Sequence, residues 1–236
     1  MEVVVGTSGF FYREWRGKFY PEDLPMSKWL SFYSQKFNGL EVNSTFYRLP
    51  KKESVRRYRR EGGNLKFSFK LYRGITHYRR LSDDNVVPFL RVKEILGERL
   101  ISLLAQFPAT FKPNRENLEF VNLLFDRFKR EGISVVVELR NGEWRGRLDE
   151  IGAPVVCSYF PKSLNWLAEC KETEEIAYFR LHGKRLYGGS YTDGELRDLA
   201  DRVRSSNSKV KAVFFNNTAD GSAVFDALRL KELLGI

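Results

Sequence analysis

Short apolar runs that end in a polar or charged residue recur along the whole chain. Apolar β-branched and aromatic residues dominate these runs, which is typical of buried β-strands. We expect strands over the following ranges: Val3–Gly6, Gly39–Asn43, Lys66–Lys70, Leu100–Gln106, Ser134–Glu138, Pro154–Cys157, Ala177–Leu181 and Val210–Phe215. A strand has no packing reason to end so often in Glu, Lys, Gln, Arg, His or Asn. These polar ends therefore indicate side chains that converge on one site.

Apolar residues three and four positions apart predict helices between most of these strands. The clearest helix is Arg115–Glu131, which has one apolar stripe and ends before Gly132. Thr192 and Glu195 form a capping box that begins another helix. The remaining helices are expected over Ser27–Phe37, Lys51–Glu61, Val86–Leu96, Trp144–Ile151, Leu164–Cys170 and the C-terminal stripe from Ala223 to Leu234.

This regular alternation of strand and helix predicts an α/β fold. Eight alternations in 236 residues fit a single (β/α)8 TIM-type barrel with eight parallel strands, formed as one domain over residues 1–236. An open doubly wound sheet is the alternative, but the turn Gly6–Gly9 lacks the spacing of the glycine-rich nucleotide turn that usually follows its first strand. The active site of a parallel barrel lies at the C-terminal strand ends, so the polar strand ends are expected to share one pocket.

The chain is strongly basic, with a formal net charge of +10 and a pI of about 9.6. This balance favours an anionic partner, such as DNA, RNA or a phosphorylated metabolite. Part of the charge has a simpler explanation, because a basic run such as Lys51–Arg60 is also expected on the solvent-exposed face of an outer helix. The high charged fraction, 30%, together with only two methionines, favours a thermophilic source.

The sequence predicts a cytoplasmic protein without a membrane partner. No apolar stretch approaches the ~20 residues that a membrane span needs, and we expect no secretion signal, because the first residues enter a strand directly. Cys157 and Cys170 are the only cysteines, which are too few for a disulfide framework and fit a reducing compartment. Because Cys157 lies in an apolar run, we expect it to be a small core residue.

Several motifs resemble the YecE-like family of uncharacterised proteins, and they follow one another in order along the whole chain. The segments that carry the resemblance are Gly6–Gly9, Trp15–Gly17, Phe19–Pro21, Glu41–Arg48, Phe69–Lys70, Thr76–His77, Gln106–Pro108, Val137–Arg140 with Trp144, Arg180–Gly183 and Phe215–Asn217. The resemblance implies a (β/α)8 barrel. It implies no settled activity, although nucleic-acid processing is the activity suggested for that family.

Four residues at the strand ends are candidates for catalysis. Glu41 and Glu138 end the second and fifth strands, and they can divide into an acid and a base if their surroundings differ; each can equally form a structural ion pair with an arginine. Lys70 can bind an anion or, if it is desolvated, form a Schiff base. The plainer alternative for this lysine is a salt bridge to one of the two glutamates. His182 suits proton transfer near neutral pH.

A second set of residues is expected to bind substrate at the same end of the barrel. Arg180 and His182 alternate on the seventh strand, so both are expected to face the barrel interior. His77 is expected to close over the site, and aromatic residues of the first loop can stack on rings or simply pack that loop against the barrel. Asn216 and Asn217 can orient substrate or cap the last helix. The full set is Asn43, His77, Gln106, Arg140, Arg180, Asn216, Asn217, Tyr12 and Trp15.

These observations favour a hydrolase or lyase that acts on an anionic, phosphate-bearing substrate, with nucleic acid as the favoured version. One alternative is a small-molecule enzyme, such as a sugar or sugar-phosphate isomerase or aldolase. Another is a non-catalytic nucleic-acid-binding module. No cofactor is expected. Glu41 and Glu138 could hold a single divalent metal, but His77 and His182 are too few histidines for a metal cluster.

Overall fold

The computed structural model describes residues 1–159 and 169–236 and confirms the parallel barrel. Its strands are β1 (Glu2–Ser8), β2 (Gly39–Val42), β3 (Lys66–Lys70), β4 (Leu100–Gln106), β5 (Val135–Glu138), β6 (Cys157–Tyr159), β7 (Ile176–Leu181) and β8 (Val210–Phe215). Its α-helices are α1 (Trp29–Lys36), α2 (Lys52–Glu61), α3 (Arg73–Thr76), α4 (Asp83–Leu96), α5 (Arg115–Lys129), α6 (Asp193–Ser205) and α7 (Ser222–Leu234). None of these helices is long and apolar enough to cross a membrane.

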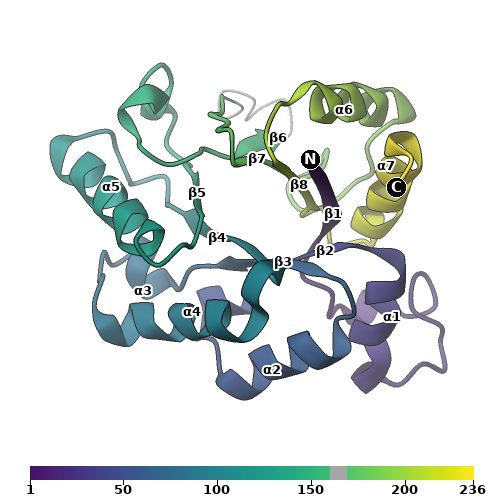
Figure 1. Ribbon diagram of the computed structural model, residues 1–236. Helices are drawn as coiled ribbons and strands as arrows, with labels where there is room; N and C mark the ends of the chain where they lie inside the picture. The colour runs from purple at the N-terminus through teal and green to yellow at the C-terminus, as the bar shows by residue number, and fades with distance from the viewer. Residues whose placement is uncertain (160–168) are drawn as a thin grey trace.

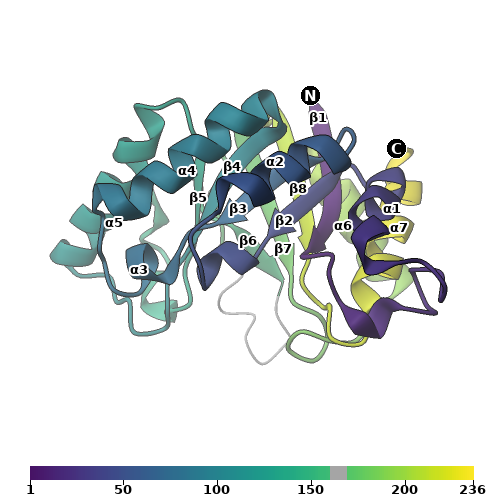
Figure 2. The ribbon, with the colours of Figure 1, turned by 90° about the horizontal axis from the view of Figure 1, so that it is seen from below.

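The strands pair in parallel in the order β5-β4-β3-β2-β1-β8-β7-β6. The N-terminal strand β1 therefore lies in the middle of the sheet, between β2 and β8. The sheet curls until β5 meets the segment before β6, where one bridge joins Val137 to Val155. Figure 1 shows the helices outside the curled sheet, with α2 beside α4 and α6 beside α7. Figure 2 shows the long loop after β1 at the end of the barrel opposite the N-terminus.

Two helix starts show how the local sequence sets these elements. Asn114 caps α5, since its side chain accepts a hydrogen bond from the Asn117 backbone at 2.8 Å. The predicted capping box of Thr192 and Glu195 is confirmed at the start of α6. Both helices then bury one apolar stripe against the sheet, so capping and periodicity agree on where each helix lies.

Alternation along the strands separates two apolar cores. Inward side chains form a small core inside the barrel, with members from β1, β4, β5, β7 and β8 such as Val4, Leu104, Val136, Tyr178 and Phe214. Outward side chains pack against the helices and form the larger core. Each fully buried apolar side chain of this size contributes about 1.5–3 kcal/mol to folding. Side chains therefore fill the N-terminal part of the barrel interior, so that part cannot hold a ligand.

The polar strand ends form the next inward layer, at the C-terminal end of the barrel. Two positions beyond Tyr178 lies Arg180, and two positions beyond Val136 lies Glu138, so each pair shares the inward face of its strand. The polar side chains buried in this layer include Ser8, Glu41, Ser68, Glu138, Arg180, His182 and Asn216. The polar residues that recur at the strand ends thus occupy inward positions on the C-terminal side of the small core.

The predicted helix Trp144–Ile151 is wrong. Two short 3-10 helices, Gly142–Trp144 and Leu148–Glu150, replace it. They are separated because Gly146 adopts a left-handed conformation with a φ of 72°, which interrupts an α-helix. The amphipathic pattern was real, since Trp144 and Leu148 are both buried, but the backbone between them turns.

The sixth strand begins later than predicted. It covers Cys157–Tyr159 instead of Pro154–Cys157, and Val155 makes only isolated bridges. Pro154 has no N–H group to donate to a sheet ladder, which shortens the usable part of the apolar run. The helix expected over Leu164–Cys170 lies outside the described residues, except for its last two positions, which are not helical.

The two cysteines, expected as reduced thiols, instead form a disulfide. Cys157 and Cys170 are bonded, with their Cα atoms 4.7 Å apart. Cys157 is buried as predicted, but the pairing could not be read from its apolar run, because it depends on Val155 bridging to Lys171. The expectation of a reducing compartment rested on unpaired thiols, so it loses that support and stays a prediction.

Gly39→Ala is expected to destabilise the barrel. A β-carbon at Gly39 would lie 2.6 Å from Cγ1 of Val4 and 3.2 Å from the Phe214 ring, so the inner core would have to shift. Overpacking of this kind costs about 1–3 kcal/mol. Chemical denaturation measures the loss, with Gly194→Ala in α6 as the matched control, because a β-carbon there meets no atom within 4 Å. Equal stability of the two variants would contradict the tight packing.

Candidate functional site

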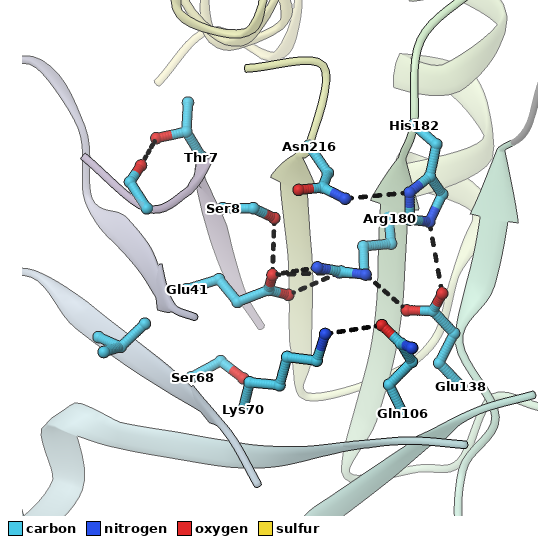
Figure 3. Close-up of polar contacts among 12 residues, drawn as sticks. Thr7, Ser8, Glu41, Ser68, Lys70, Gln106, Glu138, Arg180, His182 and Asn216 are labelled. Atoms are coloured by element: carbon cyan, nitrogen blue, oxygen red, sulfur yellow. Dashed lines mark hydrogen bonds and ion pairs between the residues drawn. The ribbon is translucent and has the colours of Figure 1, made fainter. Parts of the chain in front are cut away.

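A buried arginine, Arg180 of β7, joins the two glutamates that end β2 and β5. Its Nη2 donates to Oε1 of Glu41 at 2.7 Å, and its Nε donates to Oε2 at 3.0 Å. Its Nη1 donates to Oε2 of Glu138 at 2.8 Å. The arginine side chain is 2% exposed, and those of Glu41 and Glu138 are 0% and 1% exposed. Figure 3 shows the guanidinium lying between the two carboxylates.

Further donors on neighbouring strands engage both oxygens of Glu41. Ser8 Oγ donates to Oε1 at 2.6 Å, and the hydroxyl of Tyr178 donates to Oε2 at 2.7 Å. Tyr178 also lies 3.0 Å from Ser68 Oγ. Groups from β1, β2, β3 and β7 therefore meet around one carboxylate, which holds it in a single orientation.

Glu138 connects the arginine to a second set of polar groups. Arg140 Nη2 lies 2.5 Å from its Oε1, and His182 Nε2 lies 3.5 Å from the same oxygen. On the other side of the imidazole, the Asn216 amide nitrogen lies 3.1 Å from Nδ1. If Asn216 donates to Nδ1, the imidazole proton resides on Nε2 and faces Glu138.

The arginines keep both glutamates ionised despite their burial. Burial alone would raise the pKa of Glu41, but Arg180 outweighs it and the pKa is lowered. Burial likewise opposes ionisation of Glu138, yet Arg140 and Arg180 hold its pKa well below the usual value. Burial lowers the pKa of His182 to about 4, and the opposing influence of Glu138 does not restore it. At neutral pH the imidazole is therefore uncharged.

Lys70 lies beside this network and bonds to a neutral partner. Its Nζ donates to Oε1 of Gln106 on β4 at 2.7 Å and lies 4.2 Å from the centre of the Phe46 ring. A salt bridge from Lys70 to either glutamate, the plainer alternative, is not observed among the described residues. Burial, reinforced by the repulsion from Arg180, lowers the pKa of Lys70 to about 8.

The cluster carries an excess of positive charge at neutral pH. Arg140, Arg180 and Lys70 are cations, and the described residues place two carboxylates, Glu41 and Glu138, beside them. Arg140, with a side chain that is 14% exposed, and the partly exposed Lys70 lie nearest to solvent. An anion that enters the mouth of the barrel would therefore meet these two cations first.

His77 lies next to Lys70, with one aromatic ring between them. Its ring centre is 5.0 Å from that of Phe46, and its Nδ1 is 2.9 Å from Thr76 Oγ1. His77 also lines a polar pocket of about 250 Å³ between the loops after β3 and β4. The structure thus places this predicted residue at the rim of the mouth.

An aromatic groove of about 340 Å³ opens between the loops that follow β1 and β2. Its lining residues are Gly9, Phe10, Phe11, Tyr12, Val42, Asn43, Ser44 and Tyr58. Phe11 is 53% exposed, so its ring is accessible to a ligand. Asn43 Oδ1 is buried without a hydrogen-bond partner in the described part of the chain, and few buried polar atoms in folded proteins lack one.

A basic groove of about 300 Å³ continues on the far side of Tyr58. It shares Ser44 with the aromatic groove and adds Arg48 and Lys51, both of which are exposed. Among the described residues, neither cation has a carboxylate within ion-pair distance. The two grooves therefore place accessible rings next to uncompensated positive charge.

Two predicted binding residues do not reach the site. Trp15 is fully buried, and its indole N–H donates to the carbonyl of Thr218 at 3.1 Å, so it has no free face for stacking. Asn217 is 0% exposed and donates to Asp226 at 2.7 Å and to the Gly189 carbonyl at 3.0 Å. Neighbouring residues at a strand end point to opposite sides, so only the preceding asparagine faces the network.

Several residues of the network were missed by the sequence analysis. Ser8, Ser68 and Tyr178 bond within it, and Phe46 lies under Lys70. Tyr178 could have been predicted from the sequence, because it lies two positions before Arg180 and therefore shares the inward face of β7. Ser8 and Ser68 were harder to predict, since small polar residues also occur within apolar strands that have no functional role.

The donor set does not fit a divalent metal between the two glutamates. The guanidinium of Arg180 already bonds to both carboxylates, and its charge would repel a cation placed there. Within the described ranges, the one group of three potential metal ligands is Cys157, Cys170 and Glu172, whose two cysteines are bonded to each other.

Comparisons with known proteins agree with the motif resemblance. The model of a family described as "Protein of unknown function DUF72" matches residues 4–236. The UPF0759 protein YecE of Escherichia coli K12 is 39% identical over 87 residues, which cover 36% of this chain and about a third, 32%, of YecE. The UPF0759 protein YunF of Bacillus subtilis is 23% identical, with 92% of this chain and 90% of YunF covered. A crystal structure of a DUF72 family protein from Thermotoga maritima has a TM-score of 0.81 and 30% identity, with 100% of both chains covered.

Arg180→Met is expected to lower the free energy of unfolding by about 3–5 kcal/mol, because Glu41 would remain buried without its counter-charge and Glu138 would keep only Arg140. Chemical denaturation at neutral pH measures the loss. Arg115→Met is the matched control, since that arginine is 91% exposed in its pair with Glu119 and should change stability by no more than about 0.5 kcal/mol. Similar stabilities of the two variants would show that the buried network contributes little to folding.

Stability is expected to fall as the pH drops from about 6.5 to about 4. In this window the unfolded chain binds a proton at His182 that the folded chain does not bind, because burial lowers the folded pKa to about 4. His182→Gln should remove up to about 3 kcal/mol of this pH dependence. Denaturation of both proteins at several pH values isolates the effect, because the raised pKa of Asp226, which acts in the opposite sense, is common to both. Parallel profiles would contradict a neutral His182.

Proposed function

The chain belongs to the DUF72 family of proteins of unknown function, and we propose that it is an enzyme, a hydrolase or lyase, that acts on an anionic, phosphate-bearing substrate at the barrel mouth. Nucleic acid is the favoured substrate class. The observation that carries the proposal is the cationic excess of the mouth, where Lys70 faces a neutral amide instead of a carboxylate. A phosphate group would supply the missing negative charge.

The contacts support different roles for the charged residues. Lys70 and Arg140 bind the anion, because they lie nearest to solvent. Glu41 is a positioning residue, since both of its oxygens are engaged and it holds the guanidinium of Arg180. Glu138, with His182 behind it, is the candidate for proton transfer, because its pairing with neutral His182 offers a path for a proton.

Nucleic acid is favoured because of the two grooves beside the mouth. Bases stack on accessible rings with about 1–3 kcal/mol per base, and the aromatic groove offers Phe11 for this contact. Arg48 and Lys51 line the adjoining groove, where they could bind the phosphates of a backbone that runs past a stacked base. A small sugar phosphate would use the mouth and leave both grooves empty.

Binding of single-stranded DNA and RNA is expected at low salt, with an affinity that falls linearly in a plot of log K against log salt. Lys70→Met should weaken binding about tenfold and reduce the magnitude of the salt slope by about 1. Fluorescence anisotropy with labelled oligonucleotides measures both quantities. Lys209→Met is the control, because Lys209 is exposed and paired with Glu174 and Glu175 at the other end of β8.

Four outcomes separate the alternatives. No oligonucleotide binding at low salt would overturn the nucleic-acid version. If sugar phosphates then bind and require Lys70, the small-molecule version holds. Strand cleavage of an oligonucleotide with an abasic site, lost in Glu138→Gln while binding persists, supports an enzyme; binding without any turnover in the native protein supports a binding module.

A further inference from the structure

We propose that Lys70 is a nucleophile, and that its amine forms an imine with the aldehyde carbon of a substrate bound at the barrel mouth. This inference rests on the proposed function, because the phosphate of the same substrate would be held by the neighbouring cations. It goes further by naming a reactive atom, Nζ of Lys70, and a substrate class, a phosphorylated aldehyde in free or nucleotide-linked form.

The surroundings of Lys70 suit an amine that must lose its proton. Its Nζ donates to the neutral amide oxygen of Gln106 at 2.7 Å, and one side of it is covered by the Phe46 ring at 4.2 Å. Within the described residues, no carboxylate lies within ion-pair distance of it. Glu41 and Glu138 are the nearest candidates by position, but they bond to the arginines instead. A lysine that served only as a structural cation would be expected to pair with one of them.

Electrostatics act in the same direction as this geometry. Burial is the main cause that lowers the pKa of Lys70 to about 8, and Arg180 is the next. At pH 7 about a tenth of the side chain is then neutral, whereas well under a thousandth of an ordinary lysine is neutral. Burial, reinforced by Arg180, therefore increases the population of the nucleophilic form by about two orders of magnitude.

The reaction balances without any further reagent. The neutral Nζ attacks the carbonyl carbon, and a C–N bond forms while the carbonyl oxygen takes up a proton. The resulting hydroxyl leaves as water after a second proton transfer, so amine and aldehyde yield imine and one water. Protonated at nitrogen, the imine withdraws electrons from the adjacent carbon, which is the property that a lyase uses to break a bond there. Arg140, beside Lys70 at the solvent side, would hold the phosphate.

Lys66 provides a matched control on the same strand. It lies on the same face of β3, four positions earlier, and therefore near the other end of the barrel. Its Nζ pairs with Oε2 of Glu2 at 3.2 Å, so it has the counter-charge that Lys70 lacks. If position on β3 alone made a lysine reactive, both would react.

The experiment is reductive trapping with sodium cyanoborohydride, using two aldehyde probes: glyceraldehyde 3-phosphate and a single-stranded oligonucleotide with one abasic site. Intact mass and peptide mapping are expected to place a single adduct on Lys70 of the native protein. Lys70→Arg should reduce the adduct at least tenfold while oligonucleotide binding stays within about threefold, because arginine keeps the charge but not the nucleophile. Lys66→Arg should trap like the native protein.

The pH dependence gives an independent readout. Trapping should rise about fivefold from pH 7 to pH 8 and level off above about pH 9, as Lys70 loses its proton. The charged and titratable groups near Lys70 are Arg140, Arg180, Glu41, Glu138 and His77. The lowered pKa values of Glu41 and Glu138 keep these carboxylates ionised, the raised pKa of Arg180 keeps it charged, and the lowered pKa of His77 keeps that imidazole neutral, so the profile reports the lysine.

The outcomes distinguish this inference from the proposed function. An adduct on Lys70 with glyceraldehyde 3-phosphate alone supports the nucleophile and selects the small-molecule source. An adduct with the oligonucleotide selects the nucleotide-linked source. Oligonucleotide binding without an adduct from either probe would overturn the nucleophile and leave the anion-binding proposal standing. Adducts spread evenly over exposed lysines, or retained in Lys70→Arg, would also overturn it.

Discussion

A guanidinium buried at the centre of the barrel constrains everything around it. Removing a charge from water costs several kcal/mol, so Arg180 requires Glu41 and Glu138 as direct partners. These carboxylates in turn require the hydroxyls and the second arginine that contact them. Because a slip of one residue would turn a strand's side chains to the outer face, the network also sets the register of the strands that carry it. The polar cluster therefore specifies the closed barrel as well as the site.

The same network divides the site into a fixed part and an adaptable part. The fixed part is the pair of Glu41 and Arg180, because both oxygens of this carboxylate accept hydrogen bonds from buried donors. Lys70 forms the adaptable part, because it contacts the neutral amide of Gln106 and the ring of Phe46 instead of a carboxylate. Its pKa of about 8 also lies close to physiological pH. Lys70 is thus the member of this cluster whose pKa lies nearest to neutral pH, whereas Glu41 and Arg180 keep its electrostatic surroundings constant.

The barrel and the position of its buried polar cluster could be predicted from the sequence, because both depend on local alternation. The inward positions Glu138 and Arg180 follow apolar inward residues by two steps, and this spacing alone placed them at one end. Pairing within the site could not be predicted in the same way. Whether Lys70 meets a glutamate or Gln106 depends on the stagger between strands, and the burial of Trp15 depends on how a long loop folds back. The disulfide escaped prediction for the same reason, since the bridge between Val155 and Lys171, which brings the two cysteines together, is a tertiary contact.

The seam between β5 and β6 is the weakest line of backbone pairing in the described barrel. One bridge and two backbone hydrogen bonds at Val137 join the two sides, whereas the other neighbouring strands share continuous ladders. The ion pair between Glu138 of β5 and Arg180 of β7 spans this seam, so charge attraction adds to the few amide hydrogen bonds that close the cylinder there. A ligand that drew the guanidinium towards itself would therefore loosen the wall of its own pocket, and substrate binding and barrel closure would compete for one side chain.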